Sequence, residues 1–222
     1  MTTSTAAPGL YELRLYQPYA GRMPGLLRRF REQIPALFSR HGINCLGTWL
    51  AGGETSRLVY LTRYDGYAER EKAWAAFGAD PQWHAVRQES NAGTEMLQGY
   101  ELHFLKLRSG MLMPSQSDGQ IRELVFLPTR HGQDAQVTDW LHTALMLQLQ
   151  LAGASLAYCF DMAAGSQLPQ SVLMIGWDIE PTVLQRDILA GIRLPVELAP
   201  LDSAQARMRR LALEHIGPIP SC

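Results

Sequence analysis

The stretch Leu-Tyr-Glu-Leu-Arg-Leu-Tyr-Gln, residues 10–17, alternates between apolar and polar side chains. A period of two is typical of a β-strand whose faces meet different surroundings. Leu13 and Leu15 fall on one face, and Glu12 and Arg14 fall on the other. The stretch therefore predicts a strand that carries an acid and a base on the side opposite its leucines.

The hydrophobic pattern after this strand changes from a helical period to a strand period and back. The predicted elements are a helix near 22–42 kinked at Pro35, strands near 43–50 and 57–64 joined by the turn at 51–55, a helical region from Asp65 to Phe77 that restarts at Asp80-Pro81, and a strand near 100–107. This order predicts a ferredoxin-like βαββαβ domain of the α+β class over residues 9–108.

Residues 109–120 have the Gly, Pro and Ser content of a linker, and the sequence beyond them resembles the first half. An offset of 111 superposes four landmarks, namely Glu12 on Glu123, Gly21 on Gly132, Gly42 on Gly153, and Trp49 on Phe160. We therefore expect tandem ferredoxin-like repeats, with a degenerate second domain over 121–217. Chance similarity between two βαββαβ stretches is the alternative.

The second copy differs from the first in length and in polarity. After the hairpin loop, the offset between the two copies becomes 113. At the closing strand, an alignment of Glu101 with Glu197 gives an offset of 96. The second helical region of the second copy is therefore expected to be 17 residues shorter (113 minus 96). Arg14 aligns with Val125, and Tyr16 aligns with Leu127. Apolar spacing over 202–215 predicts a C-terminal helix. We expect any chemistry to take place in the first copy.

Composition and charge limit the classes of protein to consider. The 222 residues have a net charge of −1 and a pI near 6.6, which gives no basic field for nucleic acid or an anionic membrane surface. Three widely spaced cysteines favour neither a disulfide framework nor a cysteine metal site. No apolar run approaches the roughly 20 residues of a membrane span, and the opening residues lack signal-peptide features. We expect a cytoplasmic protein with no nucleic-acid or membrane partner.

A βαββαβ sheet covers one face with its helices and leaves the other bare. Leu13 and Leu15 are expected under the helices, which would direct Glu12, Arg14 and Tyr60 to the bare face. Two such sheets placed face to face would enclose a small-molecule cavity. The alternative is that Arg14 and Glu12 only pair with each other or across a dimer seam.

The first half contains five groups of motif residues: Tyr11-Glu12-Leu13-Arg14, His41-Gly42-Ile43 with Gly47 and Trp49, Val59-Tyr60-Leu61 with Tyr64-Asp65, Ala68-Glu69-Arg70-Glu71, and Asp80-Pro81-Gln82-Trp83. In their order and spacing they resemble the motifs of the NIPSNAP family. The resemblance covers residues 10–107 and implies a dimeric α+β barrel fold, and so a homodimer. This fold is related to that of antibiotic-biosynthesis monooxygenases and haem-degrading enzymes, and the family implies no agreed reaction.

The first functional hypothesis is a cofactor-independent oxygenase, isomerase or cyclase that acts on a small, partly aromatic or carbonyl-bearing metabolite. Arg14 would stabilise an enolate or oxyanion, Tyr60 would donate or shuttle a proton, and Glu12 would orient Arg14 or act as a base. The other residues expected to contact substrate are Tyr16, Trp49, Thr62, Tyr64 and His103. Trp49 has core packing as its alternative role.

Two further hypotheses compete with this one. The second hypothesis is haem binding, with His84 as the iron ligand, because related haem-degrading barrels carry an axial histidine on a helix in this region. Apart from this hypothesis, we expect no cofactor and no metal site. The third hypothesis is a non-catalytic, oligomerising binding or scaffold protein. The sequence has no G-x-G-x-x-G, P-loop, H-E-x-x-H, C-x-x-C or G-x-S-x-G motif, which argues against nucleotide-dependent, zinc-protease and esterase chemistry.

Overall fold

The computed structural model describes residues 9–52, 56–108, 121–165, 169–177, 193–201 and 208–216. The first half contains β1 (Leu10–Pro18), α1 (Met23–Glu32), α2 (Ile34–Arg40), β2 (Asn44–Ala51), β3 (Arg57–Tyr64), α3 (Tyr67–Ala79), α4 (Pro81–Asn91) and β4 (Leu97–Leu107). The second half contains β5 (Ile121–Pro128), α5 (Asp134–Trp140), the π-helical turn η1 (Leu141–Leu145), α6 (Met146–Leu151), β6 (Ala154–Ala164), β7 (Gln170–Trp177) and β8 (Arg209–His215).

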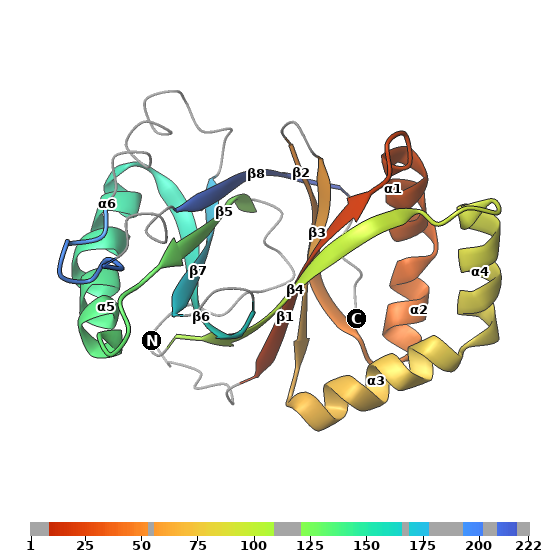
Figure 1. Ribbon diagram of the computed structural model, residues 1–222, viewed down its shortest axis with the longest axis horizontal. Helices are drawn as coiled ribbons and strands as arrows, with labels where there is room; N and C mark the ends of the chain where they lie inside the picture. Colours follow the sequence, from red (N-terminus) through yellow and green to blue (C-terminus); the bar gives the residue numbers. More distant parts are fainter. Residues whose placement is uncertain are drawn as a thin grey trace.

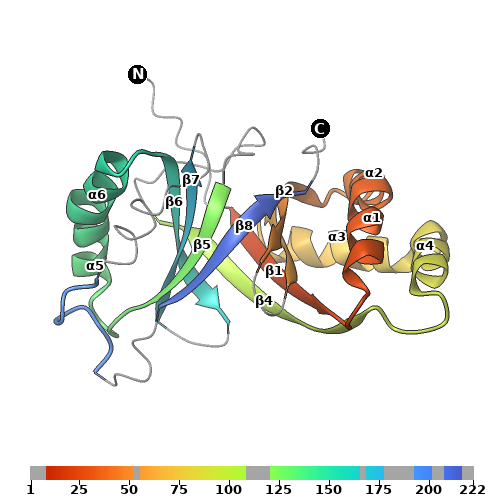
Figure 2. The ribbon, with the colours of Figure 1, turned by 90° about the horizontal axis from the view of Figure 1, so that it is seen from above.

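The eight strands form one closed antiparallel barrel, in the order β1-β3-β2-β8-β5-β7-β6-β4. The first half contributes the run β4-β1-β3-β2, and the second half contributes β8-β5-β7-β6. The two runs have the same order when the strands β5 to β8 are matched in turn with β1 to β4. The two runs meet where β2 pairs with β8 and where β4 pairs with β6. The barrel is therefore closed within a single chain (Figures 1 and 2). The α+β class predicted from the sequence is confirmed.

Helices cover the barrel on two opposite sides (Figure 1). Helices α1 to α4 lie against the strands of the first half, which we call the first sheet. The helical segments α5, η1 and α6 lie against the strands of the second half, the second sheet. The interior of the barrel is an apolar core to which both halves contribute, including Leu13, Trp49, Phe160 and Met174. The cavity expected between the two sheets is thus occupied by side chains.

The local predictions of the first half agree with the observed elements. The predicted strand at 57–64 is β3, and the helix with Pro35 is divided into α1 and α2, with Pro35 in the first turn of α2. Proline is tolerated there because the first amide groups of a helix have no intrahelical acceptor. Gly42 and Gly153 both have positive φ, of 69° and 91°, which favours glycine at these turns.

The register shows where the two halves correspond. Glu12 pairs with Thr62 across β1 and β3, and Glu123 pairs with Ile175 across β5 and β7. These pairs have the predicted offsets, 111 for the first strand and 113 for the third. Two predicted segments lie outside the described residues. They are the expected linker at 109–120 and the second helical region of the second half up to residue 192.

The predicted C-terminal helix is wrong over Arg209–His215, which is strand β8. The alignment of Glu197 with the closing strand is also wrong, because Glu197 lies in a turn before β8. Glu123 pairs with Ala212 as Glu12 pairs with Phe104, so the closing strands are offset by 108 (212 minus 104). Between the third and the closing strand, the second half is therefore shorter than the first by five residues (113 minus 108) and not by the expected 17.

No helix within the described part of the chain is both long enough and apolar enough to span a membrane.

Candidate functional site

The two faces of β1 are reversed relative to the prediction. Leu13 and Leu15 point into the barrel core, while Tyr60 packs in the apolar cluster beneath the helices of the first half. Arg14 lies on that helix side too, since its guanidinium stacks on Trp74 of α3. The alternating pattern does not choose between the faces, because both are buried here and the purely apolar side chains occupy the closed barrel.

A buried carboxylate forms the centre of a polar cluster between the first sheet and α3. The Glu12 side chain is fully buried, and one of its carboxylate oxygens accepts a hydrogen bond from Nε of Arg14. Its other oxygen, Oε2, accepts from Nε of Arg70 on α3 at 2.6 Å. One carboxylate paired with two guanidinium groups leaves the cluster with a net positive charge. A buried charge is tolerated only when it is paired in this way.

A chain of hydrogen bonds leads from Arg14 to a buried tyrosine. Nη1 of Arg14 donates to the hydroxyl oxygen of Tyr16 at 3.2 Å, and the hydroxyl groups of Tyr16 and Tyr60 are 2.7 Å apart. The Arg14 guanidinium also lies 3.9 Å above the ring of Trp74, in cation–π geometry. Tyr60 therefore connects through Tyr16 to a fixed positive charge.

The pKa shifts define the protonation states of this chain. Burial, and then the neighbouring Tyr16, raise the pKa of Tyr60 well above its usual value of 10. Burial lowers the pKa of Arg14, but the nearby Tyr60, Tyr16 and Glu12 outweigh it and raise the pKa overall. Tyr60 is thus a neutral proton donor at physiological pH, and Arg14 stays charged.

The cluster reaches solvent at one edge. Tyr16 is half-buried, and its ring centroid lies 5.6 Å from that of Tyr100 on β4, whose side chain is 58% exposed. Phe30 of α1 packs edge-on against Tyr16 on the inner side. A molecule that approaches at Tyr100 would therefore come near both Tyr16 and Arg14, since the Arg14 guanidinium lies 5.7 Å from the centroid of the Tyr100 ring.

Two other predicted residues lie on the same face as the cluster. Burial raises the pKa of Tyr64 to about 12, although the neighbouring Thr62 and Trp74 side chains lower it. Thr62 is fully buried and donates its hydroxyl to the backbone carbonyl of Glu12 at 3.3 Å, so it acts within the sheet.

Two predicted substrate contacts lie elsewhere. Trp49 belongs to the barrel core, where its ring is 6.4 Å from that of His215. His103 is buried against Phe126, and its Nε2 is 3.3 Å from a carboxylate oxygen of Glu101. Because these residues are on the barrel side of the sheet, the structure does not bring them together with Arg14 and Tyr60.

The residues around His84 do not fit a haem group. His84 is exposed on α4, whereas Val86 is the buried residue of that helix. An axial haem histidine needs an apolar pocket on the side of its ring, and the exposed imidazole of His84 does not meet this need. Among the described residues, no group of three or more His, Cys, Asp or Glu side chains is placed to hold a metal ion.

Sequence reasoning missed three members of the cluster: Arg70, Trp74 and Tyr100. Arg70 and Trp74 are four positions apart on α3, which places them on one face of the helix. Arg70 also stands in the motif Ala68-Glu69-Arg70-Glu71, but neither the motif nor the spacing shows which strand the helix covers. Tyr100 is the first residue of the strand predicted near 100–107, and no pattern distinguishes it as a member of the cluster.

The family comparison agrees with the motifs of the first half. Residues 11–107 match the model of the NIPSNAP family, which confirms the resemblance seen in that part of the sequence. No functionally curated protein has a significant sequence match to the chain.

Solved structures resemble the whole chain at low sequence identity. A candidate monooxygenase from Fusobacterium nucleatum matches 95% of this chain and 93% of its own, with a TM-score of 0.59 and 9% identity. An anthrone oxidase-like protein matches 96% of this chain and 93% of its own, with a TM-score of 0.58 and 11% identity. A NIPSNAP domain protein from Burkholderia xenovorans is 24% identical and covers 47% of this chain and 99% of its own, with a TM-score of 0.40. The first two similarities show the fold alone.

Proposed function

Residues 11–107 match the model of the NIPSNAP family, and from that premise we propose that the chain is a cofactor-independent enzyme acting on a small, partly aromatic or carbonyl-bearing metabolite. Its site is the helix-facing cluster of the first half, not the barrel interior. One observation carries the proposal: the half-buried Tyr16 hydroxyl is hydrogen-bonded to two buried groups, the Arg14 guanidinium and the Tyr60 hydroxyl.

The chemistry that suits this cluster is proton removal next to a carbonyl group. The resulting enolate or phenolate oxygen carries negative charge, which the net positive cluster stabilises. The C–H proton passes to water at the solvent side of the cluster, Arg14 is the oxyanion partner, and Tyr16 donates a hydrogen bond to the oxyanion while Tyr60 holds the Tyr16 hydroxyl in place. Glu12 is a positioning residue, because Arg14 and Arg70 occupy its two oxygens and leave neither for a base.

Anthrone is a suitable probe, because it has an acidic CH₂ group conjugated to a carbonyl, and one structural neighbour is described as anthrone oxidase-like. Its conversion by O₂ to anthraquinone and water is followed by absorbance, against the spontaneous reaction in buffer. We expect Arg14→Met to lower kcat/KM by about 10²–10³-fold. We expect Tyr16→Phe to lower it by about 10²-fold or more.

The matched control is Tyr19→Phe, because Tyr19 is an exposed tyrosine next to the same strand and outside the cluster. This variant should keep the wild-type rate. Equal rates for wild type, Arg14→Met and Tyr16→Phe would contradict the proposed site. A wild-type rate equal to that of buffer would contradict an anthrone-like substrate.

The second candidate is a non-catalytic binding or scaffold protein, and the close cover of Arg14 by Trp74 favours it. In that case the cluster only fastens α3 to the sheet. Arg14→Met would then lower the free energy of unfolding without changing the binding of any small molecule. Thermal unfolding measured beside the anthrone assay separates these two functions.

We also infer that the two halves descend from one duplicated unit. The same order of strands, the offsets of 111 and 113 in the register, and the positive-φ pairs Gly21 with Gly132 and Gly42 with Gly153 support this origin. The second copy then supplies the strands that close the barrel, which a second chain would supply to a single-copy protein.

A further inference from the structure

Three side chains of β4 form a partly exposed apolar strip beside the polar cluster of the first half. They are Tyr100, Leu102 and Phe104, which pair across the strands with Tyr16, Arg14 and Glu12 of β1 and so project from the same face of the sheet. Tyr100 is largely exposed, and Leu102 and Phe104 are partly exposed. This β4 strip offers aromatic and apolar surface to a flat molecule where solvent reaches the cluster.

Two guanidinium groups flank the β4 strip. That of Arg14 lies 5.7 Å from the centroid of the Tyr100 ring, and that of Arg70 lies 5.4 Å from the centroid of the Phe104 ring. Both arginines donate Nε–H to the carboxylate of Glu12, which sets one negative charge against two positive ones. The strip is thus bordered by an excess of positive charge.

Arg70 is the arginine that can bind a further anion. A guanidinium has five N–H donors, and Nε–H to Glu12 is the one hydrogen bond that the Arg70 side chain makes within the described part of the chain. Its side chain is 19% exposed. Arg14, in contrast, is covered by Trp74 and donates to Tyr16 as well.

The acidic neighbours of Arg70 do not cancel this charge. Glu69 and Glu71 flank it on α3, and both are exposed, so water and salt screen their charges. Lys106 is exposed two residues beyond Phe104 on the same side of β4 and adds positive charge. An anionic group at the Phe104 end of the strip is therefore stabilised.

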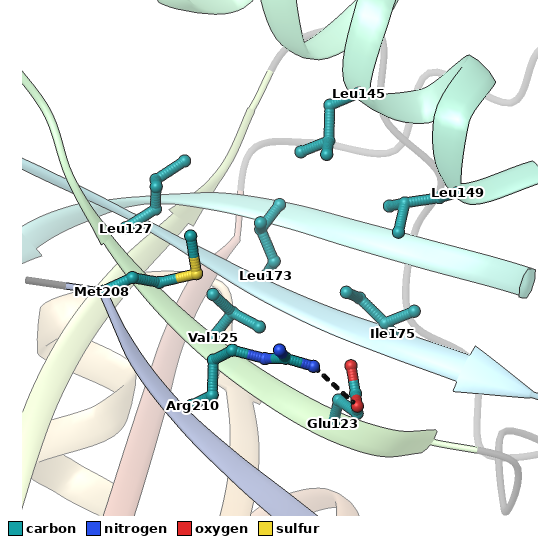
Figure 3. A pocket seen from close by; sticks show the side chains of 9 residues that line it. All are labelled: Glu123, Val125, Leu127, Leu145, Leu149, Leu173, Ile175, Met208 and Arg210. Atoms are coloured by element: carbon teal, nitrogen blue, oxygen red, sulfur yellow. Dashed lines mark hydrogen bonds and ion pairs between the residues drawn. The ribbon is translucent and has the colours of Figure 1, made fainter. Parts of the chain in front are cut away.

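The corresponding layer of the second half is aliphatic. Val125 pairs with Leu173 across β5 and β7, as Arg14 pairs with Tyr60 across β1 and β3, and Figure 3 shows both aliphatic side chains in that layer. A guanidinium and a phenol are thus replaced by hydrocarbon. Among the described residues, we therefore place an aromatic anion in the first half.

We propose that the substrate of the first-half site is a polycyclic aromatic carbonyl compound that also carries a carboxylate. Its rings lie on the β4 strip, its carboxylate binds Arg70, and its carbonyl oxygen faces Arg14 and Tyr16. Because Arg14 and Arg70 are held by the same Glu12 carboxylate, one compact ring system can reach both. This inference rests on the proposed function and adds the substrate class and the residue that selects it.

Equilibrium binding of anthraquinone-2-carboxylate tests the ligand class apart from catalysis, because a quinone has no acidic CH₂ group to react. The comparison ligand is anthraquinone-2-carboxamide, which has the same rings without the charge. Isothermal titration of the full chain measures both. We expect the carboxylate to bind about tenfold more tightly than the amide. Equal affinities, or no binding of the carboxylate, would overturn the proposal.

Substitution of Arg70 tests the residue that selects the charge. Arg70→Met should lower carboxylate affinity about tenfold and change amide affinity less than about threefold, and Arg70→Lys should restore part of the preference. The matched control is Arg87→Met, since Arg87 is an exposed arginine of α4 that pairs with Glu95. An undiminished preference in Arg70→Met, or its loss in Lys106→Gln instead, would overturn the assignment to Arg70.

Tyr100→Ala tests the position of the rings without touching the buried ion pairs, because Tyr100 is 58% exposed. It should lower the affinity for both ligands about fivefold and leave the ratio of their affinities unchanged. The matched control is Tyr19→Ala, at an exposed tyrosine outside the strip. Wild-type affinity in Tyr100→Ala would overturn the placement on β4.

Turnover separates this inference from the proposed function. Anthrone-2-carboxylate should have a KM about tenfold lower than that of anthrone, and Arg70→Met should remove this difference. Oxidation of both compounds with equal KM would overturn the substrate class and leave the proposed chemistry in place. Arg70-dependent binding of the anthraquinone with no oxidation of either anthrone would overturn the chemistry and support the ligand class.

Discussion

At the scale of single residues, Asp80 joins two elements of the first half. Its Oδ1 accepts a hydrogen bond from the backbone N–H of Gln82 at 2.7 Å and so caps α4. Its Oδ2 lies 2.7 Å from Nε2 of His41, the residue that follows α2. The hydrogen bond from His41, followed by that from Gln82, lowers the pKa of Asp80 to about 2.

This shift makes part of the stability dependent on pH. The pKa of Asp80 in the folded chain is below its usual value of 3.8, so its contribution is complete above that value and is lost as the pH falls through about 2. We expect Asp80→Asn to lower the free energy of unfolding at pH 6 and to equal the wild type near pH 2. Urea unfolding at pH 2, 3, 4 and 6 checks this, and a difference independent of pH would contradict it.

At the scale of elements, β2 contains an irregularity that one glycine permits. The register between β2 and β3 shifts between Cys45 and Gly47, and a Cβ at Gly47 would overlap the indole ring of Trp49. Trp49 is buried in the barrel core. This position therefore requires glycine because of close packing and not because of a positive φ.

We expect Gly47→Ala to destabilise the chain by about 1–3 kcal/mol, because an added methyl group overpacks the core. Gly52→Ala is the matched control, since Gly52 is at the end of the same strand with open space around its Cβ position. Chemical denaturation measures both variants. Equal midpoints for Gly47→Ala and Gly52→Ala would show that the Trp49 ring can move aside.

Strand β8 shows why one element was predicted wrongly. Met208, Leu211 and His215 fit a helical period, but Leu211 and Leu213 also fit a strand period. In the structure both leucines pack against the barrel core, while β8 pairs with β2 on one side and with β5 on the other. Over seven residues the pattern is ambiguous, and the unpaired edges of β2 and β5 determine the outcome.

At the scale of the whole molecule, the two halves share one core. Side chains from both sheets fill the barrel, and two hydrogen-bonded seams, β2 with β8 and β4 with β6, join the halves. Barrel closure therefore needs no second chain, and the homodimer expected from the resemblance stays a prediction that would involve another surface. The shared core implies that the halves unfold together.

Leu13→Ala tests this coupling. Leu13 is fully buried in the barrel, so its truncation should cost about 2–5 kcal/mol. The exchange of amide hydrogens should accelerate in β5 and β7 of the second half as well as in β1. Leu147→Ala on the exposed face of α6 is the control. Faster exchange limited to the first half would show that the halves unfold independently.

The sequence predicted much of the fold but only part of the candidate site. Short-range patterns located β1, β3, α3 and the Asp80 cap, because hydrophobic period and capping chemistry act over a few residues. They also identified Arg14, Tyr16 and Tyr60 as a group, because these residues share a strand face or a neighbouring strand. They did not identify Arg70 or Trp74 as partners, since the packing of a helix on a sheet is not encoded in local spacing.

The sequence by itself determined the α+β class, the first-half motifs, and the offsets of 111 and 113 between the halves. Only the tertiary structure decided which face of β1 meets the helices and that the barrel closes within one chain. The reason is physical: alternation specifies two faces but not their surroundings. When both faces are buried, long-range packing assigns the charged one to the side where α3 supplies Arg70 and Trp74.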